Sequence, residues 1–168
     1  VLGKQFKVKW ELDPEVVTGV QLKRDRKKGW AKLHQAGYIE QVLEKCGMTD
    51  CNPQDIPIDP GVTKGVLPVL GADPLYGWDI VKLFQCLIGM LLWAAIKCRP
   101  DMLFAVSFLG RFTANAGRIQ IGWAKGVLRY LAGTRDWGLG YQRQAVKMMI
   151  QACCDADFAG CVRSSRST

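Results

Sequence analysis

The fold of this chain is decided by its most apolar stretch, which reads Leu83-Phe84-Gln85-Cys86-Leu87-Ile88-Gly89-Met90-Leu91-Leu92-Trp93-Ala94-Ala95-Ile96 and is flanked by Lys82 and Lys97. The run is about fourteen residues long, which is shorter than the ~20 residues that a helix needs to cross a bilayer. We therefore expect a buried helix over 79–97 and no membrane partner.

Two more helices are expected after this one. Pro100 suits the first turn of a helix that continues through Phe112, and a third helix is predicted over 119–132. Strands over 138–142 and 147–154 would follow. Three packed helices together with strands predict a mixed α+β fold.

The first third of the chain is predicted to form sheet. Residues 5–10 alternate, and strands over 16–22 and 30–34 flank the charged turn 23–29. The favoured interpretation of the basic residues 23–29 is a solvated turn, and a binding loop is the alternative. A short amphipathic helix over 36–47 would then end at Gly47.

The segment between these two parts is rich in proline. It holds five of the seven prolines, with four glycines and little periodicity, so it is predicted to be an extended connection that covers the core. The chain is therefore divided into four regions: 1–48, 49–78, 79–135 and 136–168.

Composition indicates one ordinary globular domain, since 168 residues with 49% hydrophobic content can bury a core. The net charge of +8 is concentrated in residues 81–168, which carry twelve basic and four acidic groups. This excess of positive charge has two equally good explanations, which are binding to a polyanionic partner and an ordinary solvated surface rich in lysine. We expect an intracellular protein, cytoplasmic or nuclear and not secreted, because no signal peptide precedes Val1.

The seven cysteines form an odd set without CxxC spacing, which argues against a disulfide framework and a zinc ribbon. Cys46, Cys51 and the lone His34 are conceivable zinc ligands, but reduced core cysteines are the favoured reading.

Near its end the chain runs from the apolar stretch 148–154 into Asp155 and Asp157. Carboxylates at the tip of a buried strand are how a metal-dependent phosphodiesterase site begins, because such chemistry needs divalent cations held by several acids. The other acids are missing from this sequence, so the chain is expected to be a piece of a longer protein.

Several strings, in this order and spacing, closely resemble the Pol polyprotein of copia-type LTR retrotransposons. They cover nearly the whole chain and comprise Gly19–Arg26, Tyr38–Glu40, Phe84–Ala95, Arg99–Val106, Val127–Thr134 and Asp155–Gly160.

The resemblance implies the part of a reverse transcriptase that follows the polymerase active site. Region 1–48 would be the end of the palm with a primer-grip-like hairpin, 79–135 the thumb, and 136–168 the opening strands of an incomplete ribonuclease H domain. Thr18 and Gly19 would hold the primer end. Gly89 and Trp93 would lie along the minor groove of the template-primer duplex, although core packing of both residues is an equally weighted alternative.

The resemblance also assigns Asp155 as the first metal-binding carboxylate of the ribonuclease H site, with Asp157 a weaker candidate. The full-length family uses Mg²⁺. Because the Tyr-x-Asp-Asp signature and the later acids are absent from the sequence, we expect this chain alone to hold no Mg²⁺ tightly, and neither to polymerise nor to cleave.

Three functions stay open. The first is a fragment of the reverse transcriptase and ribonuclease H polyprotein that grips the RNA/DNA template-primer duplex together with the remainder of Pol. The second is a stand-alone nucleic-acid-binding module that contacts phosphates through Arg111, Arg118, Lys125, Arg129 and Arg135. The third is an inert remnant, favoured by departures from the family pattern at 115–117, 120–121 and the helix-weakening Gly126.

Overall fold

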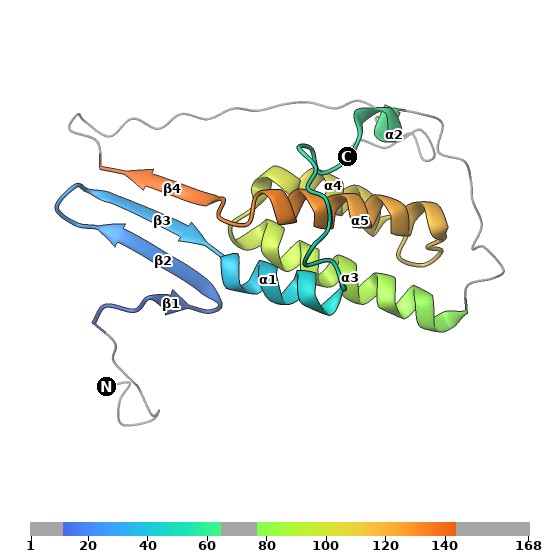
Figure 1. Cartoon of the computed structure of the whole chain (residues 1–168), viewed down its shortest axis with the longest axis horizontal. Helices are drawn as coiled ribbons and strands as arrows, with labels where there is room; N and C mark the ends of the chain where they lie inside the picture. The colour runs from blue at the N-terminus through green and yellow to red at the C-terminus, as the bar shows by residue number, and fades with distance from the viewer. Residues whose placement is uncertain (1–11, 65–76, 144–168) are drawn as a thin grey trace, which may run out of the picture.

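Four antiparallel strands and a group of helices make up the described part of the chain, which is residues 12–64 and 77–143 of a computed structural model (Figure 1). The expected mixed α+β class is confirmed. The predicted strands over 5–10 and 147–154, together with Asp155 and Asp157, lie outside these residues.

The sheet has the order β1-β2-β3-β4 and lies at one end of the helices (Figure 1). Its strands are β1 (Val16–Val17), β2 (Val20–Asp25), β3 (Trp30–His34) and β4 (Gly138–Gln142).

The prediction of one strand over 16–22 is wrong. A two-residue turn at Thr18 and Gly19, with φ of 48° and 78°, folds β1 back on β2 so that Val17 pairs with Val20. Two successive positive φ angles are those of a type I′ turn, whose twist matches a hairpin. The basic turn is correspondingly shorter than expected, because β2 continues to Asp25 and only residues 26–29 link it to β3.

The outer strand β4 pairs with β3 although about a hundred residues separate them, with Leu33 opposite Leu139 and His34 opposite Gly138. Gly138 is required by this pairing, because a Cβ atom there would overlap the carbonyl oxygen of Leu33. The described residues of regions 1–48 and 136–168 therefore share one sheet.

The helices are α1 (Ala36–Lys45), α2 (Pro60–Lys64), α3 (Trp78–Lys97), α4 (Leu103–Gly110) and α5 (Arg118–Gly133), with a 3-10 turn, η2 (Pro100–Met102), before α4. The four predicted helices are confirmed. Gly47, with φ of 63°, ends α1 as expected, because the N–H groups of Gly47 and Met48 donate to the carbonyls of Glu44 and Leu43.

The core lies between α1, α3, α4 and α5, each of which contributes fully buried side chains. It includes Ile39, Leu43, Leu91, Met102, Leu109, Val127, Leu128 and Leu131. Burial of such side chains is the main stabilising term of the fold, at about 1.5–3 kcal/mol each.

Helix α3 was predicted to be a buried helix, and the structure buries one side of it only. Phe84, Leu91 and Ala95 face the core, whereas Leu83 and Ile96 are 68% and 65% exposed. Among the described helices, α3 is long and apolar enough over Asp79–Lys97 to cross a membrane, a property that the core helices of soluble proteins share.

A polar cluster around the buried Arg99 joins the start of α4 to the end of α5. The guanidinium of Arg99, which has no exposed surface, donates to both carboxylate oxygens of Asp101 and to the carbonyl and hydroxyl oxygens of Thr134. The rings of Tyr130 and Trp137 lie 5.3 and 5.9 Å from the guanidinium carbon. The cluster thus brings together two of the strings that carry the family resemblance.

The first part of the proline-rich connection packs on α5. Gly133 leaves room for the ring of Pro53, because a Cβ atom there would come within 3.0 Å of the Pro53 Cβ. A Cβ atom on Gly126 would lie 3.6 Å from the side chain of Gln54, an ordinary contact distance.

Two of the departures from the family pattern also have structural roles. Ala116 is completely buried, and the side chain of Gln120 accepts a 2.9 Å hydrogen bond from the backbone N–H of Gly117 at the start of α5. Decay of the sequence stays an untested prediction.

Candidate nucleic-acid interface

The most exposed side of α3 carries Gly89 and Trp93, the two residues predicted to follow a minor groove. Gly89 is exposed, and a Cβ atom built on it meets no atom within 4 Å. Trp93 is 43% exposed. The alternative that both residues pack in the core is therefore wrong.

This side of α3 is bordered by basic residues. Lys97, one turn beyond Trp93, places its Nζ 4.7 Å from the centre of the indole ring, which is a cation–π distance. Lys82, near the other end of the helix, is exposed, and Gln85 donates to the carbonyl of Thr113. We call the side formed by Lys82, Gln85, Gly89, Trp93 and Lys97 the α3 face.

The basic residues of α5 form a second surface. Arg118, Lys125 and Arg129 recur at intervals of seven and four residues, which places them on one side of the helix, opposite its buried residues. Since α3 and α5 turn their buried sides to the same core, this basic stripe points away from the α3 face. The structure does not bring the two sets of predicted residues together.

Two of the arginines that were predicted to contact phosphates donate hydrogen bonds to backbone carbonyl oxygens instead. Arg129 donates a 2.7 Å hydrogen bond to the carbonyl of Asn52, and Arg135 donates to the carbonyls of Ala132 and Thr49. Both guanidinium groups therefore fasten the connection to α5. Arg111, which caps the end of α4, is exposed and stacks 5.9 Å from the ring of Phe108.

Thr18 and Gly19 form the exposed tip of the β1–β2 hairpin. The tip is held near the start of α1, because the side chain of Gln21 accepts a 3.1 Å hydrogen bond from the backbone N–H of Gly37 (Figure 1). A positive φ at a glycine leaves the turn backbone open to close approach.

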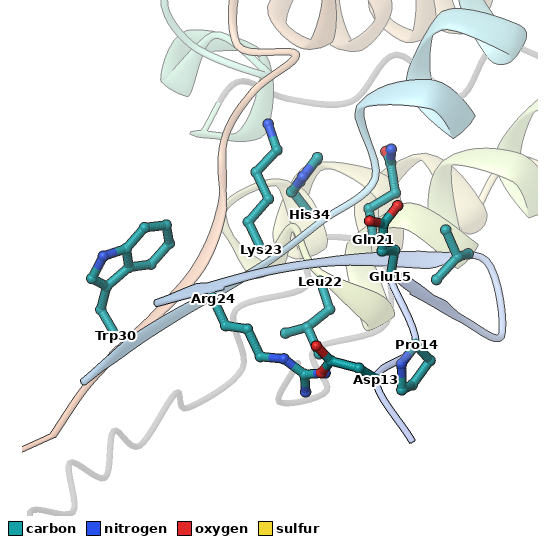
Figure 2. Close-up of a pocket in the computed structure, with 10 residues that line it drawn as sticks. Asp13, Pro14, Glu15, Gln21, Leu22, Lys23, Arg24, Trp30 and His34 are labelled. Carbon is teal, nitrogen blue, oxygen red and sulfur yellow. The ribbon is translucent and has the colours of Figure 1, made fainter. Parts of the chain in front are cut away.

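An open pocket of about 540 Å³ lies along the sheet beside this hairpin (Figure 2). Its lining mixes charges of both signs, and an ion pair between Asp13 and Arg24 closes one side. The lining includes Glu15, Gln21, Lys23 and His34. Of these residues, the sequence singled out only His34, as a conceivable zinc ligand. Lys23 and Lys32 could have been recognised as neighbours from the pairing register of β2 and β3. That register depends on the position of the turn between the two strands.

In the part of the chain that the structure describes, no group of three or more His, Cys, Asp or Glu side chains could hold a metal ion, so these residues do not supply a Mg²⁺ site. Asp155 and Asp157 lie outside that part. Burial raises the pKa of the Cys46 and Cys98 thiols, which therefore stay protonated at neutral pH and are not activated nucleophiles.

Comparison with known proteins gives a consistent set of relatives. The chain is 33% identical over 136 residues to an uncharacterized mitochondrial protein of Arabidopsis thaliana, which covers 81% of this chain and 53% of that protein. It is 29% identical over 171 residues to the retrovirus-related Pol polyprotein from transposon TNT 1-94 of Nicotiana tabacum, covering 99% of this chain and 12% of the polyprotein.

A third relative is the retrovirus-related Pol polyprotein from transposon RE1 of Arabidopsis thaliana, at 27% identity over 160 residues, or 95% of this chain and 10% of the polyprotein. No family model matches the chain, and no solved structure matches it. The chain spans 53% of the mitochondrial relative and 12% of the tobacco polyprotein.

These relatives place the chain among the proteins of retroelements. More specifically, it corresponds to part of a retrotransposon Pol polyprotein, and the resemblance to the copia-type family is confirmed.

Proposed function

We propose that this part of Pol contributes template-primer binding to RNA-directed DNA synthesis, with the α3 face lying along the minor groove of the RNA/DNA duplex. The observation that carries the proposal is the open space at Gly89. A helix that must approach a duplex closely needs a position without a side chain, and an exposed aromatic ring one turn away supplies apolar contact with the sugars.

Charge supports the same partner. Lys82 and Lys97 lie toward the two ends of the α3 face, roughly 22 Å apart at 1.5 Å per residue, so they can reach phosphates while Gly89 and Trp93 occupy the groove between them. The hairpin tip at Thr18 and Gly19 is the candidate contact with the primer end.

The test is binding of a fluorescein-labelled RNA/DNA hybrid to the whole chain, measured by fluorescence polarisation. Gly89→Leu fills the open space and is expected to weaken binding about tenfold, the effect of roughly 1.4 kcal/mol. Gly122→Leu is the matched control, because Gly122 is also helical, exposed and free of neighbours within 4 Å, but lies on α5. Trp93→Ala should weaken binding to a similar extent.

Salt dependence tests the phosphate contacts that this proposal shares with the stand-alone binding module. Phosphate contacts make the logarithm of the affinity fall steeply with the logarithm of the salt concentration. A flat response, or equal binding by the Gly89→Leu and Gly122→Leu variants, contradicts the proposal. A cooperative melt without any binding at low salt favours the inert remnant.

We further propose that catalysis needs the rest of the polyprotein, in which Mg²⁺ is the expected cofactor, and that the protein acts in the cytoplasm or nucleus without a membrane partner. The purified chain should therefore leave the RNA of a hybrid intact in the presence of Mg²⁺. Cleavage that disappears in an Asp155→Asn variant contradicts this, as does recovery of a tagged chain from the culture medium.

A further inference from the structure

The two faces of the sheet differ in chemistry. On one face, Leu22, Leu33 and Leu139 form a row across three strands, from the pairing of Leu22 with Leu33 and of Leu33 with Leu139. On the other face, Lys23 pairs directly with Lys32, and β4 places Gly140 opposite Lys32. The glycine has no side chain, so this face is open beside the lysine pair.

A directly opposed pair of lysines is unfavourable, because like charges on facing strands repel. Within the described residues neither Lys23 nor Lys32 forms an ion pair, whereas Arg24, on the other face, pairs with Asp13. No carboxylate of the described residues is ion-paired with either lysine, and a bound anion would relieve the repulsion.

A hydrogen-bond donor without a partner lies next to these lysines. His34 is 3% exposed, and its Nδ1 accepts a 3.4 Å hydrogen bond from the backbone N–H of Ala36, which assigns the ring proton to Nε2. Nε2 is buried and has no partner within the described residues. Figure 2 shows the side chains of Lys23 and His34 projecting from the same side of the sheet.

The electrostatics around the imidazole agree with this geometry. Burial lowers the pKa of His34, and the charges of Lys23 and Lys32 lower it further, while Asp136 in the turn before β4 opposes them. The ring is thus a neutral donor in a region where positive charge exceeds negative charge.

We propose that Lys23, Lys32 and His34 form a phosphate-binding site on the sheet, and that its ligand is a phosphate of a nucleic-acid backbone. The two ammonium groups supply the charge. The Nε2–H of His34 supplies a directed donor once the side chains around it shift, since this atom is buried. The choice of nucleic acid as the source of the phosphate rests on the proposed function, whereas the site itself does not involve the α3 face.

The single histidine of the chain makes the site directly observable, because its imidazole signals need no assignment. Inorganic phosphate and a short single-stranded DNA are titrated separately into the whole chain at constant ionic strength, and the ring signals are followed by NMR. Both ligands should move these signals in the wild type and not in a Lys23→Gln/Lys32→Gln variant. Lys45→Gln, which removes an exposed charge at the end of α1, should respond as the wild type does.

Three outcomes overturn the proposal. The ring signals do not move with either ligand, or they move equally in the double variant, or they move with inorganic phosphate but not with DNA, in which case the site takes free phosphate. The double variant should remain folded, because removing the opposed charges relieves repulsion in the sheet.

The same variants distinguish this site from the α3 face. The double variant should reduce the salt slope of DNA binding by roughly 0.7, since one phosphate contact is lost and each such contact contributes about that much to the slope for a single strand. Gly89→Leu should leave the response of His34 to phosphate intact. A response lost in Gly89→Leu but retained in the double variant would place the phosphate on α3 and contradict the sheet site.

Discussion

The hydroxyl of Tyr130 donates a 2.6 Å hydrogen bond to Oδ2 of Asp101, across 29 residues of sequence. The same oxygen accepts a 2.7 Å hydrogen bond from the buried guanidinium of Arg99. Two segments that carry the resemblance to the Pol family, Arg99–Val106 and Val127–Thr134, thus meet in one polar cluster. The contacts among Arg99, Asp101, Tyr130 and Thr134 give these four residues a structural role at the junction of η2, α4 and α5.

Replacement of Arg99 should be the most damaging single change in this cluster. Arg99→Met leaves the carboxylate of Asp101 and the oxygens of Thr134 without their donor, and we expect a loss of about 3 kcal/mol in the free energy of unfolding. Chemical denaturation measures this loss. Arg111→Met removes an exposed arginine and should change stability by no more than about 0.5 kcal/mol. Equal effects of the two changes would show that the cluster is not stabilising.

The cluster should also make stability depend on pH. Burial alone would raise the pKa of Asp101, but hydrogen bonds from Arg99 and Tyr130 and the charge of Arg99 outweigh it and hold the pKa below its ordinary value of 3.8. The ionised carboxylate is therefore favoured in the folded state, so its contribution is present above pH 3.8 and is lost as the pH falls through the lower pKa of the folded state.

Unfolding experiments between pH 6 and 2.5, a window set by the direction of that shift, check this expectation. Asp101→Asn should flatten the acid side of the stability curve relative to the wild type. An unchanged slope in this variant would mean that other carboxylates produce the acid sensitivity.

The glycines of α5 should respond differently to alanine. Gly122→Ala meets no neighbour and should stabilise the chain by up to about 1 kcal/mol through helix propensity. Gly133→Ala places a Cβ atom 3.0 Å from the Cβ of Pro53. This close contact should push the proline-rich connection away from α5 and cancel the gain in helix propensity. Thermal melts of both variants test the difference, and an equal gain would show that the connection yields freely.

Two glycines of β4 offer a second matched pair. Gly138→Ala would overlap the carbonyl oxygen of Leu33, so it should weaken the pairing of β4 with β3, with a cost of about 1–3 kcal/mol. Gly140→Ala has open space and should be tolerated. Amide hydrogen exchange of β3 residues should accelerate in the first variant alone. Unchanged protection in both would contradict the shared sheet.

The helices of this chain were predictable because their signals are local. Apolar residues at helical spacing, Pro100 at a first turn and Gly47 as a left-handed stop need no distant partner to act, and the predicted and observed helices differ by only a few residues at their ends. The hairpin was less predictable. Val16 and Val17 favour a strand, but no local sequence signal predicts the positive φ of Thr18.

The candidate sites depended on distant parts of the chain. The Lys23–Lys32 pair follows from a register that a single turn position fixes, and the separation of the α3 face from the α5 stripe follows from packing of both helices on one core. The sequence named both sets of residues but did not place them relative to one another, because spacing within a helix carries no information on the direction in which that helix faces.

The amino-acid sequence by itself determined the family, the α+β class and the helices, since these rest on residue identity and on periodicities within one element. Only the tertiary structure decided which side of α3 is exposed. That helix is apolar almost all round, so its buried side is fixed by the neighbours that cover it, and Gly89 and Trp93 lie on the side left uncovered within the described residues.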